Sequence, residues 1–212
     1  VQAQKSSVYV KASLNLANIS VNKDGQVDDS RALPSFHAGL QADLAIGSFF
    51  AIQPGVIFTG KGSKLESGNT SGDNWYRVST RPYYIEVPVN AVIKIPLGEE
   101  TRFFVGAGPY AAIGVGGKNK IEGELFGVDF SRTQNIKFSD DDPFTSGEEG
   151  SGYGIMKRFD YGLNGTVGIE GKRALFSVNY GLGLAKLQSG TSSSDDELNK
   201  HRVLSFTLGV KL

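Results

Sequence analysis

Apolar and polar residues alternate one by one along several stretches of this chain. The segment 36–46 is the clearest, because its even-numbered positions are all apolar and its odd-numbered positions include His37, Gln41 and Asp43. A helix would mix the two sets around its surface, whereas a strand separates them onto two faces. The same pattern predicts eight strands, at 8–17, 35–46, 49–61, 81–95, 101–116, 155–170, 174–187 and 201–212.

The connections between these strands alternate between short and long. Three are tight turns, at 47–48, 96–100 and 171–173, and four are long and rich in Ser, Gly, Asn and Asp, at 18–34, 62–80, 117–154 and 188–200. Most strands are about 10–16 residues long, which exceeds the usual ~5–6 and suffices for a tilted transmembrane strand of roughly 9–11. We therefore expect an all-β, eight-stranded antiparallel up-and-down transmembrane β-barrel over residues 8–212, with both termini periplasmic and the long loops outside.

Alternation alone does not say whether the apolar face points to lipid or to a soluble core, so a soluble barrel such as a lipocalin is the alternative. Three features favour lipid. The polar faces are rich in glycine, which suits a crowded interior, and the last strand alternates to its final residue. Aromatic residues also gather near the strand ends of the apolar faces, as in membrane girdles; they are Phe36, Phe50, Phe58, Tyr83, Phe103, Phe159, Tyr161 and Phe176.

Composition narrows the function classes. The chain has 22 basic and 22 acidic residues, so no overall field suggests nucleic acid as a partner. It has no cysteine, which excludes disulfides and thiolate metal sites. No apolar run approaches the roughly 18 residues of a membrane-spanning helix. Residues 1–7 are expected to be the remnant of a secretory signal peptide or a disordered N-terminus.

Four stretches carry a family resemblance. They are Ile52-Gln53-Pro54-Gly55-Val56-Ile57-Phe58-Thr59-Gly60-Lys61-Gly62-Ser63, Tyr84-Ile85-Glu86-Val87-Pro88-Val89, Phe104-Val105-Gly106-Ala107-Gly108-Pro109-Tyr110, and Phe159-Asp160-Tyr161-Gly162-Leu163-Asn164-Gly165 followed by Tyr180-Gly181-Leu182-Gly183-Leu184. In this order the stretches resemble the PorT-like outer-membrane β-barrel family, from about residue 35 to 212. The resemblance implies a Gram-negative outer membrane and an eight-stranded barrel, and it implies little about activity.

Charged residues on the polar faces form the first candidate site, a polar network in the lumen. Mixed signs occur at both expected depths, and an unpaired charge in a narrow lumen would cost several kcal/mol, so we expect internal pairing. Eight strands leave an interior that side chains just fill, which argues against a general diffusion pore. A polar track for a solute is the alternative. The residues are Lys11, His37, Asp43, Lys61, Glu86, Lys94, Arg102, Arg158, Asp160, Glu170 and Lys211.

No catalytic residue, metal site or soluble cofactor is predicted. His37 and His201 could approach Ser35, Ser205 or Asp160, but spacing cannot establish contact, and the familiar hydrolase and zinc-protease motifs are absent. The Gly-x-Gly stretches open no helix, so nucleotide binding is not expected. For His37 and for His201, a structural role or a place in a loop is the simpler interpretation.

The outer loops form the second candidate site, a partner surface. The loop 117–154 is long for a passive connection and is acidic. The run Asp140-Asp141-Asp142 lacks the spacing of a known calcium loop and is interpreted as solvated charge. Trp75 and Tyr76 are either an interface anchor or part of the interfacial aromatic belt. The predicted partner-binding residues are Trp75, Tyr76, Asp140, Asp141, Asp142 and Phe144.

Three functions remain open at this point. The first is a non-enzymatic structural or accessory subunit in contact with outer-membrane lipid and possible partners among other envelope proteins. The second is a narrow channel or carrier for a small or apolar ligand. The third is a lipid-modifying or proteolytic barrel enzyme.

Overall fold

Alternating sequence becomes long, paired strands in the computed structural model, which describes residues 6–19, 30–68, 74–139, 155–185 and 200–212. None of these residues forms a helix long and apolar enough to span a membrane. The described strands are β1 (Ser7–Ile19), β2 (Ser30–Arg31), β3 (Leu33–Ile46), β4 (Phe50–Gly60), β5 (Ser63–Gly68), β6 (Asn74–Pro96), β7 (Arg102–Leu125), β8 (Val128–Asn135), β9 (Lys137–Ser139), β10 (Ile155–Lys157), β11 (Phe159–Glu170), β12 (Ala174–Gly183) and β13 (His201–Lys211).

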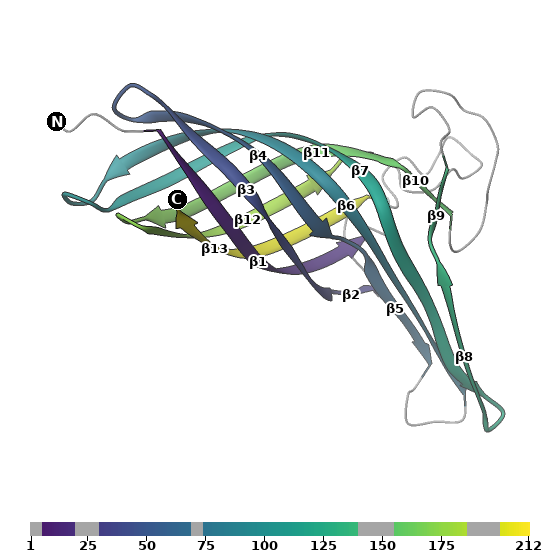
Figure 1. Ribbon diagram of the computed structural model, residues 1–212. Helices are drawn as coiled ribbons and strands as arrows, with labels where there is room; N and C mark the ends of the chain where they lie inside the picture. The colour runs from purple at the N-terminus through teal and green to yellow at the C-terminus, as the bar shows by residue number, and fades with distance from the viewer. Residues whose placement is uncertain (1–5, 20–29, 69–73, 140–154, 186–199) are drawn as a thin grey trace.

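The long strands close into a barrel (Figure 1). Neighbouring strands pair antiparallel in the order β6-β4-β3-β1-β13-β12-β11-β7, and a further pairing between β6 and β7 completes the ring. β1 joins β13 through a register that places Tyr9 opposite Lys211. The first and last strands therefore begin and end at the same end of the barrel, which is also the end with the tight turns. The predicted all-β, antiparallel architecture is confirmed.

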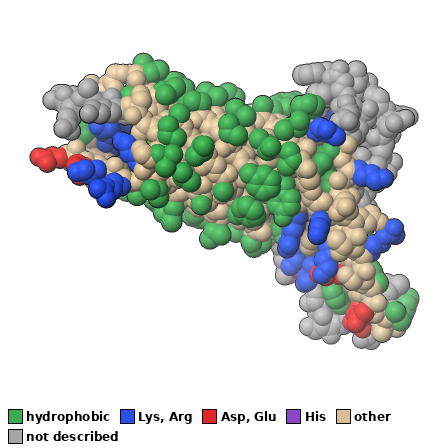
Figure 2. Space-filling model, viewed as in Figure 1, with side chains coloured by type: hydrophobic (Ala, Val, Ile, Leu, Met, Phe, Trp, Pro, Cys, Tyr) green, Lys and Arg blue, Asp and Glu red, His purple; other side chains and the backbone are tan. Residues whose placement is uncertain are grey.

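The faces of the barrel are sorted as the alternation indicated, with apolar side chains outside. Leu14 is 73% exposed and Leu208 is 65% exposed, while Lys94 and Asp43 on the inner face are almost fully buried. Figure 2 shows hydrophobic side chains along the outer wall of the barrel. In a soluble barrel these faces would be reversed, so the outward apolar wall is built to contact lipid.

The sequence prediction is wrong about where the long connections begin. β6 starts at Asn74 instead of residue 81, and β7 continues to Leu125 instead of residue 116. β5 and β8 pair with these continuations, so parts of the predicted loops 62–80 and 117–154 are strands. Thirteen strands are therefore described where eight were predicted. The remainder of the loops 18–34, 117–154 and 188–200, and residues 1–5, lie largely outside the described residues.

The continued strands form a sheet that leaves the barrel at one end. We call it the extension, and it consists of β2, β5, β8, residues 74–81 of β6 and residues 118–125 of β7. It bends away from the barrel axis (Figure 1). The register between β6 and β7 shifts at Tyr83/Tyr84, and such a β-bulge locally bends and twists a ladder. The bulge thus lies where the extension departs from the barrel.

Candidate functional site

A lysine between two carboxylates fills the lumen at the end with the tight turns. Lys94 on β6 is completely buried and forms ion pairs with Asp43 on β3 and Glu170 on β11. The Tyr9 hydroxyl on β1 donates a hydrogen bond of 2.9 Å to Glu170. Four strands that are distant in sequence thus meet at one cation. Buried charges are tolerated only when they are paired and hydrogen-bonded, and this cluster meets both conditions.

A second cluster, also a lysine between two carboxylates, lies toward the end of the barrel opposite the tight turns. Lys61, just after β4, places its Nζ 2.7 Å from Glu86 Oε2 and 2.8 Å from Asp160 Oδ2. The Tyr110 hydroxyl donates to Asp160 at 3.3 Å, and the Lys61 ammonium lies 4.1 Å from the centre of the Tyr110 ring. Asn164 donates to Glu86 at 3.2 Å. The cation is therefore held by two carboxylates and by the face of an aromatic ring.

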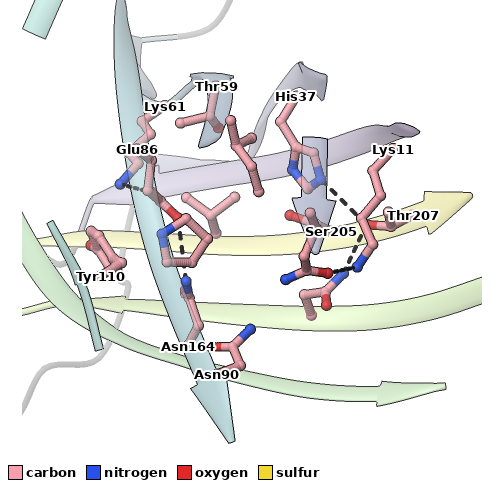
Figure 3. A pocket seen from close by; sticks show the side chains of 16 residues that line it. Lys11, His37, Thr59, Lys61, Glu86, Asn90, Tyr110, Asn164, Ser205 and Thr207 are labelled. Carbon is pink, nitrogen blue, oxygen red and sulfur yellow. Dashed lines mark hydrogen bonds and ion pairs between the residues drawn. The ribbon is translucent and has the colours of Figure 1, made fainter. Parts of the chain in front are cut away.

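Between the two clusters lies a polar cavity of about 60 Å³. Its walls include the Lys11 amine, which contacts Gln41, and His37, whose Nε2 lies 3.4 Å from the Thr207 hydroxyl. Figure 3 shows Lys61 and Glu86 on one side of this space and His37 and Lys11 on the other. The volume accommodates only a few water molecules. The described lumen therefore holds a small chamber that Lys61 and Glu86 line on one side and Lys11 and His37 on the other.

Side chains of β9 and β10 and of Ile136 pack together at the end of the barrel opposite the tight turns. Phe138 on β9 packs edge-on against Tyr84 with ring centres 5.8 Å apart, and Tyr84 in turn contacts the His201 ring at 5.6 Å. A β-carbon added at Gly114 would lie 2.3 Å from the Phe138 ring, so the ring sits where only glycine leaves room. Ile136 and Met156 are buried beside Phe138. Phe138 thus packs against Tyr84 and Tyr110, the two tyrosines beside the Lys61 cluster.

The structure separates the predicted lumen residues into two groups. Lys11, Asp43, Glu86, Lys94, Asp160 and Glu170 are buried inside the barrel, and His37 is half-buried there. Arg102 and Lys211 are half-buried at strand ends near the tight turns, and Arg158 is half-buried in the bend between β10 and β11. The network is thus built from inward-facing positions, and several of them, such as Asp43, Lys94 and Glu170, lie close to the strand ends at the tight turns.

The sequence interpretation missed the tyrosines and amides that complete both clusters. Tyr9, Tyr84 and Tyr110 all point inward and are buried. Gly162 leaves room for one of them, since a β-carbon there would lie 2.7 Å from the Tyr110 ring. A signal was present, because these tyrosines occupy polar-face positions of the alternation. They were not named as site residues because the candidate network was chosen from charged residues and histidine alone.

The predicted partner surface is only partly described. Trp75 and Tyr76 lie on β6 within the extension and not in a loop, with Tyr76 45% exposed and Trp75 half-buried. The Arg77 guanidinium lies 5.5 Å from the centre of the Trp75 ring. Asp140, Asp141, Asp142 and Phe144 lie outside the described residues.

A chain of ion pairs crosses one face of the extension. Arg77 lies 2.5 Å from Glu66 and 3.2 Å from Glu122, and Lys64 lies 2.7 Å from Glu66. The hydrogen bond from Lys64, aided by Arg77, lowers the pKa of Glu66. The hydrogen bond from Lys120, also aided by Arg77, lowers the pKa of Glu122. These carboxylates are consequently ionised over the whole neutral range.

The histidines do not assemble a catalytic arrangement in the described part of the chain. No hydrogen bond joins His37 or His201 to Ser35, Ser205 or Asp160 there, and neither ring nitrogen of His201 has a protein partner. No group of three or more His, Cys, Asp or Glu side chains among the described residues is arranged to hold a metal ion. The described side chains in the lumen pack against one another and pair their charges.

An antiparallel barrel with an apolar outer wall and a charged, filled lumen defines an integral membrane β-barrel. The sequence matches the family described as outer membrane protein beta-barrel domain over residues 2–189. The chain belongs to this family, and its location is the bacterial outer membrane. No curated protein sequence gives a significant match.

Solved structures to which the chain is similar include three outer-membrane proteins. Ail, the attachment invasion locus protein of Yersinia pestis, is 12% identical, with a TM-score of 0.40, over 97% of this chain and 95% of Ail. Neisserial surface protein A is 12% identical, with a TM-score of 0.42, over 99% of both chains. OprG from Pseudomonas aeruginosa is 11% identical, with a TM-score of 0.46, over 99% of this chain and 95% of OprG.

Proposed function

We propose that this protein is a non-enzymatic structural or accessory subunit of the outer membrane that engages another envelope protein through its extension. The observation that carries the proposal is the hairpin between β7 and β8, which ends in Phe126 and Gly127. Phe126 is 83% exposed and has a positive φ of 50°. Asn, Asp or Gly would occupy this position at lower cost. An exposed aromatic residue held there is typical of a contact point.

The edge of the extension supports a protein partner. β8 pairs with β7 on one side and, among the described strands, ends the sheet on the other. All eight of its residues are exposed, and Val128 and Phe130 are apolar. A free edge offers backbone hydrogen bonds to an added strand, and alternate apolar side chains supply specificity. The partner we infer is therefore an envelope protein that adds an extended segment to β8.

The lumen supports the same proposal by leaving little room for transport. The buried Lys61–Glu86 pair lines the 60 Å³ chamber, and the buried Lys94 cluster fills the lumen near the tight turns. A solute would have to break the ion pairs of Lys94 or Lys61 to pass, at a cost of several kcal/mol. A channel or carrier role is thus disfavoured relative to a scaffold role.

The finer classification is also a proposal. We infer that the chain belongs to the PorT-like subgroup, because all four stretches that resemble it lie mainly on the barrel strands β4, β6, β7, β11 and β12. We also infer that both termini and the tight turns face the periplasm, while the extension projects from the cell surface.

Site-specific photocrosslinking in native membranes tests the partner proposal. A photoreactive amino acid is placed at Phe126 or Val128 on the extension and, as a matched control, at Val87, which is 46% exposed on the barrel wall. We expect discrete protein adducts from positions 126 and 128 and no adduct of the same mass from 87. Equal adduct patterns at all three positions, or protein adducts from 87 alone, would contradict the proposal.

A further inference from the structure

The face of the extension that continues the lipid-facing wall carries an excess of positive charge. Strand alternation places Arg81 on the same face as Tyr83, two residues away. Tyr83 stacks on Phe58 at 5.5 Å and contacts Phe36 at 6.4 Å, so it belongs to an aromatic cluster on the outer wall of the barrel. Arg81 therefore lies directly outward of the aromatic belt, at the level where lipid headgroups are found.

The pairing of β6 with β7 places a second cation beside the first. Arg81 is directly opposite Lys118 in the register, and both side chains are exposed. Directly opposed residues have Cβ atoms about 4.5–5.5 Å apart, and like charges there are destabilising. Among the described residues neither side chain forms an ion pair. An external anion would relieve this repulsion.

The next rows of the same face extend the cationic surface. Ser79, two residues further out, pairs with Lys120 on β7 and with Lys64 on β5. Among the described side chains on these rows of β5, β6 and β7, five are cations and two are carboxylates, and these residues are Lys64, Arg77, Arg81, Lys118, Lys120, Glu66 and Glu122. Glu124 and Asp129 occupy the same face farther out, near the tip. Positive charge is thus concentrated nearest the barrel (Figure 2).

We propose that the Arg81–Lys118 pair, with Lys64 and Lys120 behind it, binds the phosphate groups of a phosphorylated lipid in the outer leaflet. Three observations select a lipid over other anions. The cations are continuous with the lipid-facing wall, they begin at the aromatic belt, and the bend at Tyr83/Tyr84 inclines the extension away from the barrel axis. The proposal therefore places this face of the extension against the lipid headgroups.

The single tryptophan of the chain reports on this surface. Trp75 lies on the same face of β6 as Arg77 and Arg81. The full-length protein in detergent micelles is titrated with bisphosphorylated lipid A and, separately, with dephosphorylated lipid A, while Trp75 fluorescence is recorded. We expect the phosphorylated lipid to bind at least tenfold more tightly. Equal affinities for the two lipids would overturn the proposal.

A charge-matched pair of variants locates the site. The double variant Arg81→Gln/Lys118→Gln is expected to bind bisphosphorylated lipid A about 25-fold more weakly, roughly fivefold per cation removed. The control Arg132→Gln/Lys137→Gln removes the same charge from the opposite face of β8 and from β9 and should bind like the wild type. Heat-modifiable gel mobility verifies that each variant retains the barrel. An unchanged affinity in the first variant, or an equal loss in the control, would overturn the assignment.

Discussion

Lys61 and Asp160 are 99 residues apart, yet their charged atoms lie 2.8 Å from each other inside the barrel. They belong to parts of the wall that do not pair directly, because β6 and β7 lie between β4 and β11 in the ring. Lys94 and Glu170, 76 residues apart, are related in the same way at the other end. These contacts form only when the sheet curves enough for its inner face to meet itself across the lumen, so they link the charge pattern to the curved barrel wall.

Replacement of Lys94 by methionine removes the cation from the cluster near the tight turns. Asp43 and Glu170 would then lose the one cation that forms ion pairs with both of them, and both are at most 6% exposed. Breaking a buried ion pair by deleting one partner costs about 3–5 kcal/mol. We expect Lys94→Met to lower the free energy of unfolding by this amount, as measured by urea titration of the protein in lipid vesicles.

The control for this prediction is an exposed ion pair in the same protein. Lys172 lies 2.7 Å from Glu100 at the tight turns, and both side chains are more than half exposed. Surface pairs contribute about 0–1 kcal/mol. Lys172→Gln should therefore unfold almost like the wild type. If the free energy of unfolding falls equally in the two variants, the Lys94 cluster does not stabilise the barrel.

Two glycines on β7 test the packing of Phe138 at the end of the barrel opposite the tight turns. A β-carbon at Gly114 would lie 2.3 Å from the Phe138 ring, whereas a β-carbon at Gly116 would have no heavy atom within 4 Å. We expect Gly114→Ala to displace Phe138 and to accelerate amide hydrogen exchange at residues 137–139. Gly116→Ala should leave this exchange unchanged. Equal exchange in both variants would show that Phe138 does not depend on the space at Gly114.

The ion pairs of the extension predict a dependence on pH. The pKa values of Glu66 and Glu122 are lowered in the folded protein by Lys64, Lys120 and Arg77. A lowered pKa means that the stabilisation is present above the ordinary value of 4.5 and is lost as the pH falls through the folded-state value. Arg77 also lies over Trp75. We expect Trp75 fluorescence to change in a transition centred below pH 4.5.

The variant Glu66→Gln/Glu122→Gln provides the check on that transition. It removes both titrating carboxylates while keeping their shapes, so the fluorescence step should disappear. A step that persists in the variant, or a wild-type midpoint above pH 4.5, would assign the change to other groups.

Strands in the barrel wall could be predicted from the sequence, whereas strands in the extension could not. The barrel segments alternate strongly because one face meets lipid and the other meets a polar lumen, as in the segment 36–46. The residues 74–81 and 118–125 alternate weakly, because they lie in the extension, beyond the apolar wall and the polar lumen of the barrel. Strands such as β5 and β8 consequently read as polar loops and were missed.

The candidate site was predictable in part for a related reason. Distance from the tight turns gives the rough depth of a residue along a strand, which placed Asp43 and Lys94 near one end and Glu86 and Asp160 toward the other. The partners across the lumen depend on the shear of the closed barrel, which a single sequence does not reveal. For this reason the contact between Tyr9 and Glu170 emerged only from the structure.

We conclude that the two lysine–carboxylate clusters block the lumen, and we propose that the protein acts through its extension. Single-channel recording of the purified protein in planar bilayers distinguishes a blocked lumen from an open one. We expect no stable conductance steps in the wild type over the voltage range that the bilayer tolerates. Reproducible, long-lived open steps from the wild-type protein would contradict it.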